Sequence, residues 1–444
     1  MYQTEYQRKK TDPWSMADKI QSGETIHVSG ASGVPLAMEQ ALVGLIGRRE
    51  NIRATSYMHF GDKPAFFEAE NAEQTFQVAS IFHNRELMKA DSLQVSSYIP
   101  TNLRSAERDL TWRNDHIDWL IVGVSPMDKS GYFSITSGGL LEPALVPCAR
   151  HIIVEVLKNA PRLFGDVLIH ISEVDAIIDE GNKFSPLPVR APSETDIKLG
   201  KQVAEFVEDG ATIQLGFGGL VDALVPELKK KKDLGIHSEV VTDSTMELIK
   251  SGAVNNRKKT LHRGLSVTAF WGGSETFAEF LNDNPSFLFR SISYTNHPNI
   301  IASNNQLTSI NAAIQVDLTG QCASESLGTK QFSGTGGQLD FAVGAQMSPG
   351  GKSIIAIHST VEVRDSVTGE KKIFSKITPT LQPGAAVSTT RSNVHYIVTE
   401  YGAACLRGLS TKERAKALIK ISHPDFRAWL EEEFERLYGM KLTG

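Results

Sequence analysis

One carboxylate, Glu239, follows a glycine-rich turn, a helical run and a strand-like run within residues 211–239. The turn reads Gly216-Phe-Gly-Gly, and a glycine turn before a helix presents backbone N–H groups to a phosphate or another anion. The carboxyl ends of neighbouring parallel strands form the usual ligand crevice of an α/β sheet. Glu239 is therefore a candidate ribose-binding group or nucleophile, with a solvated side chain as the plain alternative.

A dinucleotide fingerprint is the first interpretation of this turn. The sixth position of such a fingerprint is Gly or Ala, which lets the helix pack closely on the strand. In this chain Val221 occupies that position. A dinucleotide-dependent oxidoreductase and a purely structural glycine turn stay open as alternatives.

A second glycine cluster, Gly334-Thr-Gly336-Gly337, exposes backbone N–H groups at close range. Such a loop predicts an oxyanion site or a phosphate cradle, and a flexible hairpin is the alternative. Glu400 follows an apolar run and is either structural or a polar group that supports a site.

The composition describes an ordinary globular chain of 444 residues, long enough for two or three domains. A net charge of -5 argues against general nucleic-acid binding. The cysteines Cys148, Cys322 and Cys405 form no C-x-x-C pair, which excludes a thiolate zinc site and suits a reducing cytosol. The histidines form no ligand motif, so no metal is expected. With no signal-peptide core and no membrane-length apolar run, the sequence predicts a soluble cytoplasmic protein.

These candidate residues belong to a chain that repeats itself. Residues 20–30 resemble 207–216, and the turn 128–131 resembles 317–320, at nearly one offset. The turns 128–131 and 317–320 each follow an apolar run. A proline-rich linker covers residues 182–193. We interpret this as a duplication that gives two similar α/β domains, 1–190 and 191–444.

Strand-like and helical runs alternate in both halves, which favours mainly parallel sheets with helices on both faces. The C-terminal part is helical, because Ser410-Thr-Lys-Glu413 is a capping box and Pro424 suits the start of a helix. The expected strands are 119–124, 167–171, 176–178, 310–316 and 353–358, and the expected helices are 42–48, 198–207, 221–231 and 425–438.

Five strings together resemble the acetyl-CoA hydrolase/transferase branch of the class I CoA-transferases. They are GIHSE at 235–239, AIQVDLTG at 313–320, GTKQFSGTGGQLDF at 328–341, VTEYG at 398–402 and HPDF at 423–426. The similarity covers nearly the whole chain and is densest after residue 200, with the 4-hydroxybutyrate and butyrate enzymes as its nearest branch.

The resemblance implies two similar α/β halves with the active site between them. It also implies a ping-pong exchange in which Glu239 attacks an acyl-CoA thioester and becomes a glutamyl-CoA thioester. The backbone N–H of Gly337 matches the oxyanion donor, and Asn296 and Glu400 match polar positions of the active site. Coenzyme A, as part of the substrate, is expected at residues that match the family's binding turn and its lining: Gly216, Phe217, Gly218, Gly219, Leu220, Ala313, Ser333 and Gly337.

The family further implies acyl-CoA and short-chain carboxylate substrates and a homo-oligomer. Departures lie at Glu362, where relatives carry a lysine for CoA phosphate, and at an insertion over 363–372, from which Lys371 or Lys372 is a substitute. The acyl-pocket segments 29–35 and 58–63 are atypical of the butyrate enzymes. The acid is therefore of the 4-hydroxybutyrate, butyrate or acetate type, or a dicarboxylate such as succinate or itaconate. Against this transferase stand the oxidoreductase and a noncatalytic CoA-binding protein.

Overall fold

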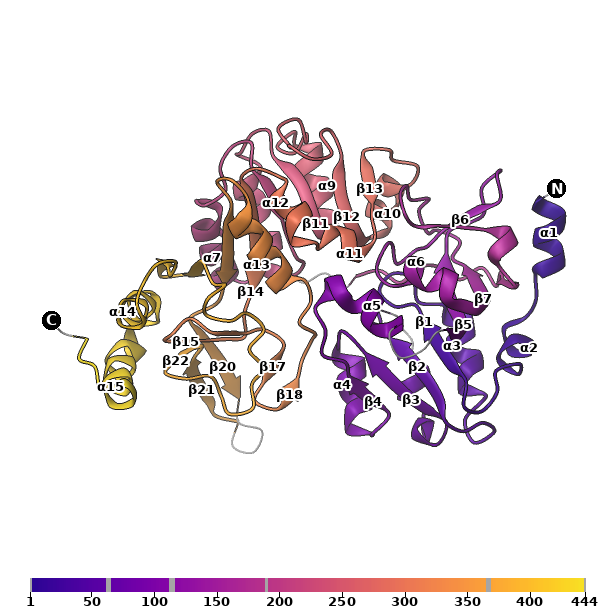
Figure 1. Ribbon diagram of the computed structural model, residues 1–444, viewed down its shortest axis with the longest axis horizontal. Coiled ribbons are helices and arrows are strands. Elements are labelled where there is room, and N and C mark those ends of the chain that lie inside the picture. Colours follow the sequence, from indigo (N-terminus) through magenta and orange to yellow (C-terminus); the bar gives the residue numbers. More distant parts are fainter. Residues whose placement is uncertain (1, 61–64, 112–115, 188–190, 365–368, 443–444) are drawn as a thin grey trace. The chain divides into compact units, whose positions relative to one another are not determined.

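The computed structural model describes residues 2–60, 65–111, 116–187, 191–364 and 369–442, which fall into two compact units (Figure 1). The first unit comprises Met1–Val189, Ser238–Met246 and Leu265–Asn296, and the second comprises Arg190–His237, Glu247–Gly264 and His297–Gly444. The units are discontinuous in sequence, whereas the predicted domains 1–190 and 191–444 are linear; that linear boundary stays a prediction.

The first unit is built on a parallel sheet with the strand order β4-β3-β2-β1-β5-β7-β9 in its described part. Strand β5 is buried along its whole length, as expected for a central parallel strand covered on both faces. The strands are β1 Thr25–Val28, β2 Ile52–Ser56, β3 Phe76–Ser80, β4 Ser96–Tyr98, β5 Ile117–Val124, β7 Ala149–Val156 and β9 Ala176–Ile178, with β6 Tyr132–Ser134 and β8 Leu168–His170 as an antiparallel pair.

The second sheet has the strand order β13-β12-β11-β10-β14-β19-β23-β24. Strand β11 belongs to the second unit up to His237 and to the first unit from Ser238. The strands are β10 Thr212–Gln214, β11 Gly235–Val241, β12 Ser266–Trp271, β13 Phe287–Phe289, β14 Leu307–Ala312, β19 Lys352–Ala356, β23 Tyr396–Thr399 and β24 Gly402–Cys405. Smaller sheets are formed by β15 Gln315–Asp317, β16 Cys322–Ala323 and β22 Ile377–Thr378, by β17 Ser326–Leu327 and β18 Lys330–Gln331, and by β20 Thr360–Arg364 and β21 Lys371–Ser375.

Helices alternate with the strands, as the sequence predicted. They are α1 Tyr2–Lys9, α2 Pro13–Ala17, α3 Leu36–Val43, α4 Arg85–Ser92, α5 Ala106–Thr111, α6 Glu142–Leu145, α7 Glu194–Ala204, α8 Gly219–Leu228, α9 Asp243–Lys250, α10 Glu275–Leu281, α11 Ile292–Thr295, α12 Pro298–Ala302, α13 Gln338–Met347, α14 Thr411–Ile421 and α15 Arg427–Tyr438. Short 3-10 turns are η1 Phe66–Glu68, η2 Ala72–Gln74, η3 Leu103–Ser105, η4 Val146–Cys148, η5 Ile171–Glu173 and η6 Pro424–Phe426.

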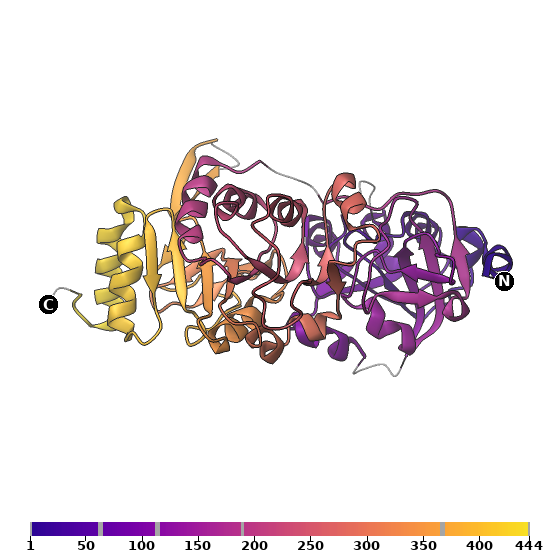
Figure 2. The ribbon, with the colours of Figure 1, turned by 90° about the horizontal axis from the view of Figure 1, so that it is seen from above.

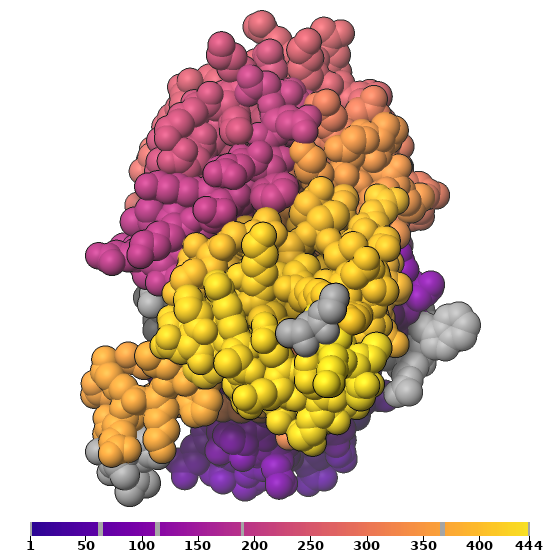
Figure 3. Space-filling view, turned by 90° about the vertical axis from the view of Figure 1, so that its left-hand side faces the viewer, coloured from indigo at the N-terminus to yellow at the C-terminus, as the bar shows by residue number. Residues whose placement is uncertain are grey.

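Each unit has its own apolar core. In the first, Met38 and Leu42 of α3 pack with strand residues such as Ile26 and Ile121. In the second, α14 and α15 lie side by side at the C-terminal end and bury Leu418 among residues of the second sheet (Figures 2 and 3). The fold class, an α/β protein of two halves with mainly parallel sheets, is confirmed.

The duplication is visible in the topology. The order β4-β3-β2-β1-β5-β7-β9 matches β13-β12-β11-β10-β14-β19-β23 strand for strand, and β24 is added at the edge. Thr25 of β1 lies opposite Arg53, and Thr212 of β10 lies opposite Gly235. Tyr57 lies four residues after Arg53, and Glu239 lies four residues after Gly235. Tyr57 is therefore the residue of the first half that corresponds to Glu239 in the second half.

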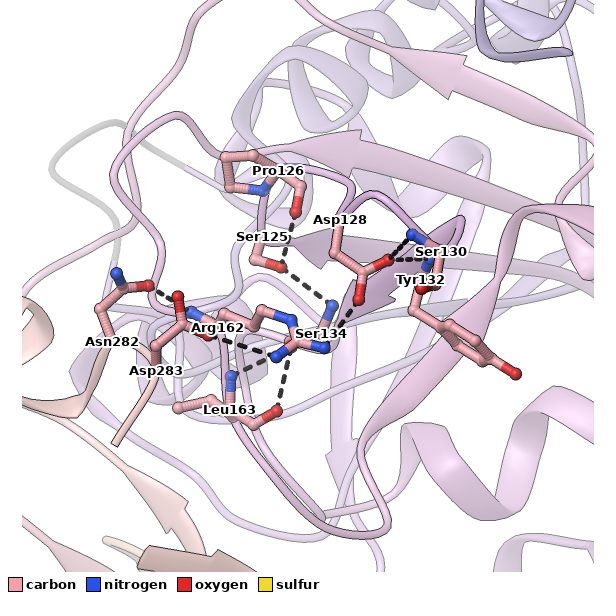
Figure 4. Close-up of polar contacts among 10 residues, drawn as sticks. All are labelled: Ser125, Pro126, Asp128, Ser130, Tyr132, Ser134, Arg162, Leu163, Asn282 and Asp283. Carbon is pink, nitrogen blue, oxygen red and sulfur yellow. Dashed lines mark hydrogen bonds and ion pairs between the residues drawn. The ribbon is translucent and has the colours of Figure 1, made fainter. Parts of the chain in front are cut away.

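The repeated turns also share their hydrogen bonds. In the first half, Oδ1 of Asp128 accepts from the backbone N–H of Ser130 at 2.8 Å and of Tyr132 at 2.9 Å. Its second oxygen accepts from Arg162 at 2.7 Å, and Figure 4 shows that Arg162 also reaches Asp283. Gly131 has a φ of 86°, a conformation that suits glycine.

In the second half, Oδ1 of Asp317 accepts from the backbone N–H of Thr319 at 2.9 Å and of Gln321 at 3.0 Å. Gly320 has a φ of 96°. The aspartate therefore closes the same turn in both halves, which explains why these residues recur in the sequence.

Two local predictions need correction. The helix expected over 42–48 is instead α3, which ends before Gly44, because residues 44–47 form turns and Gly47 adopts a φ of 72°. The strand expected over 310–316 is divided into β14 and β15, because β15 leaves the main sheet to pair with β16 and β22. The capping box at Ser410 is confirmed, since Ser410 and Glu413 exchange side-chain-to-backbone hydrogen bonds at the start of α14.

Candidate active site

Glu239 and Asn296, both predicted site residues, lie together in the first unit. The Asn296 side-chain amide donates a hydrogen bond of 2.7 Å to Oε2 of Glu239. The Glu239 backbone carbonyl accepts from the Thr268 hydroxyl at 3.1 Å, which fixes this end of β11 to β12. Glu239 is half-buried, so its carboxylate is both oriented and accessible.

Asn296 is positioned by the way α11 ends. It is the C-cap of this short helix, and the following His297-Pro298 starts α12, so the chain cannot continue as one helix. Asn296 is fully buried, and its Oδ1 atom has no hydrogen-bond partner among the described residues. A buried amide held at a carboxylate in this way orients a nucleophile or a base.

The turn Gly216–Leu220 lies in the second unit, between β10 and α8. Gly218 has a φ of 102° and is the N-cap of α8, so no side chain caps the first turn of the helix. No heavy atom of the described residues lies within 4 Å of the position that a Cβ would take at Gly216 or Gly218. Phe217 is exposed. This leaves room for the close approach of an anionic ligand to the backbone.

Glu400 is held by Ser359 in the same unit. Both oxygens of Glu400 accept from Ser359: its hydroxyl donates to Oε1 at 2.6 Å and its backbone N–H to Oε2 at 3.0 Å. The engaged carboxylate therefore fixes the segment after β19.

Glu400 and Gly219 line one cavity of about 720 Å³. Asp196 and His358 line it too and are joined at 2.9 Å. Burial raises the pKa of Asp196, but the hydrogen bonds from Ser193 and the charge of His358 outweigh it, and the pKa lies below its ordinary value.

Asp196, His358 and Ser359 were not among the predicted site residues. Ser193-Glu-Thr-Asp196 is a capping box at the start of α7, which is the signal for Asp196, but it indicates a helix start rather than a site. His358 and Ser359 lie a few residues before Glu362, where the chain departs from the family pattern.

The insertion forms the hairpin β20–β21. Glu362 pairs with Lys371 at 2.8 Å and lines the 720 Å³ cavity. Lys372 lies opposite Val363 on the partner strand and is exposed. Lys371 and Lys372 were the two expected substitutes for the family's lysine. Of these two residues, Lys371 is the one that pairs with Glu362.

The remaining predicted residues also lie in the second unit. Gly337 is the N-cap of α13, and no side chain caps this helix. The Ser333 backbone N–H donates to the Glu325 carbonyl at 3.1 Å, which anchors the glycine loop. Ala313 lines a cavity of about 1010 Å³, which shares Val361 with the cavity lined by Gly219 and Glu400.

At the carboxyl ends of β1 and β2, Ala31 and Met58 both adopt a positive φ, of 50° and 35°. The Ala31 backbone N–H donates to the Met58 carbonyl at 2.7 Å. Residues outside glycine that are held in this conformation mark strained, often functional, segments. Residues 61–63 of the expected acyl pocket lie outside the described residues.

Two absences apply to the described residues, 2–60, 65–111, 116–187, 191–364 and 369–442. No group of three or more His, Cys, Asp or Glu side chains is placed there to hold a metal ion. None of the described helices is long and apolar enough to cross a membrane.

Two family models match the chain. The acetyl-CoA hydrolase/transferase N-terminal domain matches residues 1–188, and the acetyl-CoA hydrolase/transferase C-terminal domain matches residues 273–434.

Curated relatives are similar over nearly the whole length. The 4-hydroxybutyrate coenzyme A transferase of Clostridium kluyveri is 38% identical over 98% of this chain and 99% of its own. The butyryl-CoA:acetate CoA-transferase of Anaerostipes caccae is 34% identical over 98% of both chains. Among solved structures, RipA from Yersinia pestis superposes with a TM-score of 0.88 at 34% identity, covering 99% of this chain and all of its own.

Proposed function

Because the chain belongs to the acetyl-CoA hydrolase/transferase family, we propose that it is an acyl-CoA:carboxylate CoA-transferase that works through Glu239. The observation that carries this proposal is the 2.7 Å hydrogen bond between Asn296 and the Glu239 carboxylate, which orients a half-buried nucleophile.

The reaction proceeds in two mirrored halves. A Glu239 oxygen attacks the acyl-CoA thioester carbonyl, the C–S bond breaks, and a mixed anhydride and CoA thiolate form. The thiolate attacks the glutamyl carbonyl, which releases the first acid as its carboxylate and leaves a glutamyl-CoA thioester. The second acid then reverses these steps. Anhydride and thioester conserve the energy of the starting bond, which a serine ester would lose.

The other predicted residues have supporting roles in this proposal. The backbone N–H of Gly337 stabilises the oxyanion of each tetrahedral intermediate. The turn Gly216–Leu220 binds CoA, with Ala313 and Ser333 as lining. Glu400 positions the segment around Ser359. Exclusion of water protects both intermediates from hydrolysis.

The acid is a short-chain carboxylate. Relatives of this length are named for 4-hydroxybutyrate and for butyrate and acetate, and a further one is named a succinyl-CoA:cyclohexane-1-carboxylate CoA transferase. We propose an acid of the 4-hydroxybutyrate, butyrate or acetate type, with succinate and itaconate as the dicarboxylate alternative. We also propose a cytoplasmic homo-oligomer with domains 1–190 and 191–444.

Trapping of the intermediate tests the mechanism. The enzyme is incubated with acyl-CoA in the absence of an acceptor acid and is then treated with borohydride or hydroxylamine. The masses of its peptides are measured by mass spectrometry after digestion. We expect one modified peptide, with the change on Glu239, and none in Glu239→Gln. Glu247→Gln, a glutamate that pairs with Lys229 on the surface, is the matched control and should still be trapped.

A panel of acyl-CoA donors crossed with acetate, succinate, itaconate and 4-hydroxybutyrate then identifies the acids and separates transfer from hydrolysis. Full exchange activity in Glu239→Gln would rule out the mechanism. Bound NAD in the purified protein would favour the oxidoreductase, and CoA binding without exchange would favour the noncatalytic protein.

A further inference from the structure

A cavity of about 1010 Å³ in the second unit has a mainly apolar wall. One side is the hairpin β20–β21, and the other is the segment from η6 to α15. The exposed large apolar side chains that line it are Leu327, Val361, Val363, Phe374 and Trp429. A cavity of this size lies at the upper end of the range for small-molecule sites.

These apolar side chains are unusually open to solvent. Val363 is 47% exposed, Phe374 49% and Trp429 40%, and Leu327 and Val361 are also exposed. Figure 3 shows the hairpin in orange at the lower left beside the C-terminal helices in yellow. Large apolar groups that gather in this way mark a binding surface more often than a chance arrangement.

One cation, Lys376, lines this cavity. It is half-buried, and its ammonium makes no ion pair or hydrogen bond with a described residue, although its backbone N–H donates to the Ser359 carbonyl at 2.8 Å. Burial lowers the pKa of Lys376, and the charge of Glu400 opposes this shift. An anion at this place would supply the direct partner that the lysine lacks.

The charges of the lining favour a monoanion. Lys376 is the only cation among the lining residues, and Asp425 lines the same cavity, so a polyanion such as a nucleotide phosphate chain would find one positive charge for its several negative charges. Apart from Val361, the cavity shares no lining residue with the 720 Å³ cavity of Gly219 and Glu400.

We propose that this cavity binds a free fatty acid of medium chain length, with the hydrocarbon chain among the apolar walls and the carboxylate paired with Lys376. Glu239 is not among the residues that line this cavity, and the proposal does not depend on the proposed reaction. It gives the protein a binding activity toward apolar acids that differs from the exchange of short-chain acids.

Quenching of Trp429 fluorescence tests the proposal. The probe is 11-bromoundecanoate, whose bromine quenches an indole that it touches, and 11-bromoundecanol is the neutral match. Trp429 is one of five tryptophans, so Trp429→Phe identifies its share of the signal. Lys376→Met removes the charge but keeps the length of the side chain, and Lys420→Met, at an exposed position of α14, is the control.

We expect saturable quenching by the acid at one site per chain and about tenfold weaker binding of the alcohol, equivalent to about 1.4 kcal/mol. Lys376→Met should bind acid and alcohol equally, Lys420→Met should behave as the parent, and Glu239→Gln should bind the acid normally. Melting curves establish that each variant is folded.

Four results would overturn the proposal. They are the absence of saturable quenching, quenching that survives in Trp429→Phe, equal binding of acid by the parent and Lys376→Met, and displacement of the acid by acetyl-CoA. Displacement by acetyl-CoA would assign the cavity to the CoA site, because Ala313 lines the cavity and is also proposed to line the CoA site. If a second copy covers the cavity instead, no acid binds, and Val363→Asp converts a dimer to a monomer in sedimentation.

Discussion

Replacement of Asn296 by alanine removes the donor that orients Glu239. The lost hydrogen bond is 2.7 Å long, is made by a fully buried amide and ends on a carboxylate. A hydrogen bond to a charged group contributes about 1.5–3 kcal/mol. If the whole amount acts on the transition state, kcat/KM for the acyl-CoA falls by a factor of roughly 10 to 150.

The assay follows the acyl-CoA consumed with a saturating acceptor acid, for the parent, Asn296→Ala and Asn299→Ala. Asn299 is exposed one turn further along and serves as the control, with parent activity expected. Asn296→Asp adds a diagnostic readout. Its second carboxylate disfavours ionisation of Glu239, so the acidic limb of the pH–rate profile moves to higher pH.

The reasoning fails if folded Asn296→Ala keeps kcat/KM within twofold of the parent. It also fails if Asn296→Asp loses activity without any displacement of the acidic limb, because a merely structural role would do that. Melting temperatures measured in parallel separate both results from unfolding.

Three other changes have defined outcomes. Asp128→Asn weakens the hydrogen bonds that the carboxylate accepts within its turn and removes the ion pair with Arg162. The free energy of unfolding, measured with urea, should fall by about 2 kcal/mol. Burial raises the pKa of Asp128, but the hydrogen bonds from the Tyr132 backbone and Arg162 lower it overall. This stability is therefore present above the ordinary pKa of about 4, is lost as the pH falls through the lower folded value, and is missing from the variant. Gly30→Ala places a Cβ 1.7 Å from the Tyr57 carbonyl oxygen and should cost about 3 kcal/mol or more in thermal unfolding. Glu362→Lys should lower KM for acyl-CoA about threefold at low salt, an effect that ions screen.

The two stability changes have control variants, and the change at Glu362 has outcomes that would refute it. Asp18→Asn breaks an exposed pair with Arg48 and should cost less than about 0.5 kcal/mol, so an equal loss in both aspartate variants would contradict the role of burial. Gly47→Ala meets no atom within 4 Å but has a φ of 72°, so it should cost only about 1 kcal/mol. For Glu362→Lys, a KM that is unchanged at low salt, or lowered equally at 0.5 M salt, would refute a contact with phosphate.

The sequence was sufficient for the parts of the fold that rest on local chemistry. Strand β9 at Ala176–Ile178, the capping box at Ser410 and the duplicated aspartate turns depend on neighbouring residues and were predicted as they stand. The departure of β15 from the main sheet depends on its pairing with β22, about sixty residues further along the chain. Residue periodicity does not contain that partner.

In the candidate site too, contacts between residues distant in the sequence could not be predicted from local sequence patterns. Glu239 and Asn296 are 57 residues apart, and only the resemblance to the family joined them before the structure gave their hydrogen bond. Asp196 and His358 were missed because their pairing spans 162 residues, and the capping box that contains Asp196 indicates only the start of a helix. Roles that depend on one side chain meeting another distant in sequence could not be predicted from spacing.

The position that matches Glu239 in the first half bears on whether the duplication could be reversed. A duplication starts from two identical copies, yet one copy now has a half-buried carboxylate, and the other has Tyr57, buried with its hydroxyl donating to the buried Glu142. A mutation of Tyr57 to glutamate would not restore a second nucleophile, because two buried carboxylates would face each other. At least two substitutions, at Tyr57 and at Glu142, would therefore be needed before the first half could carry a nucleophile at this position.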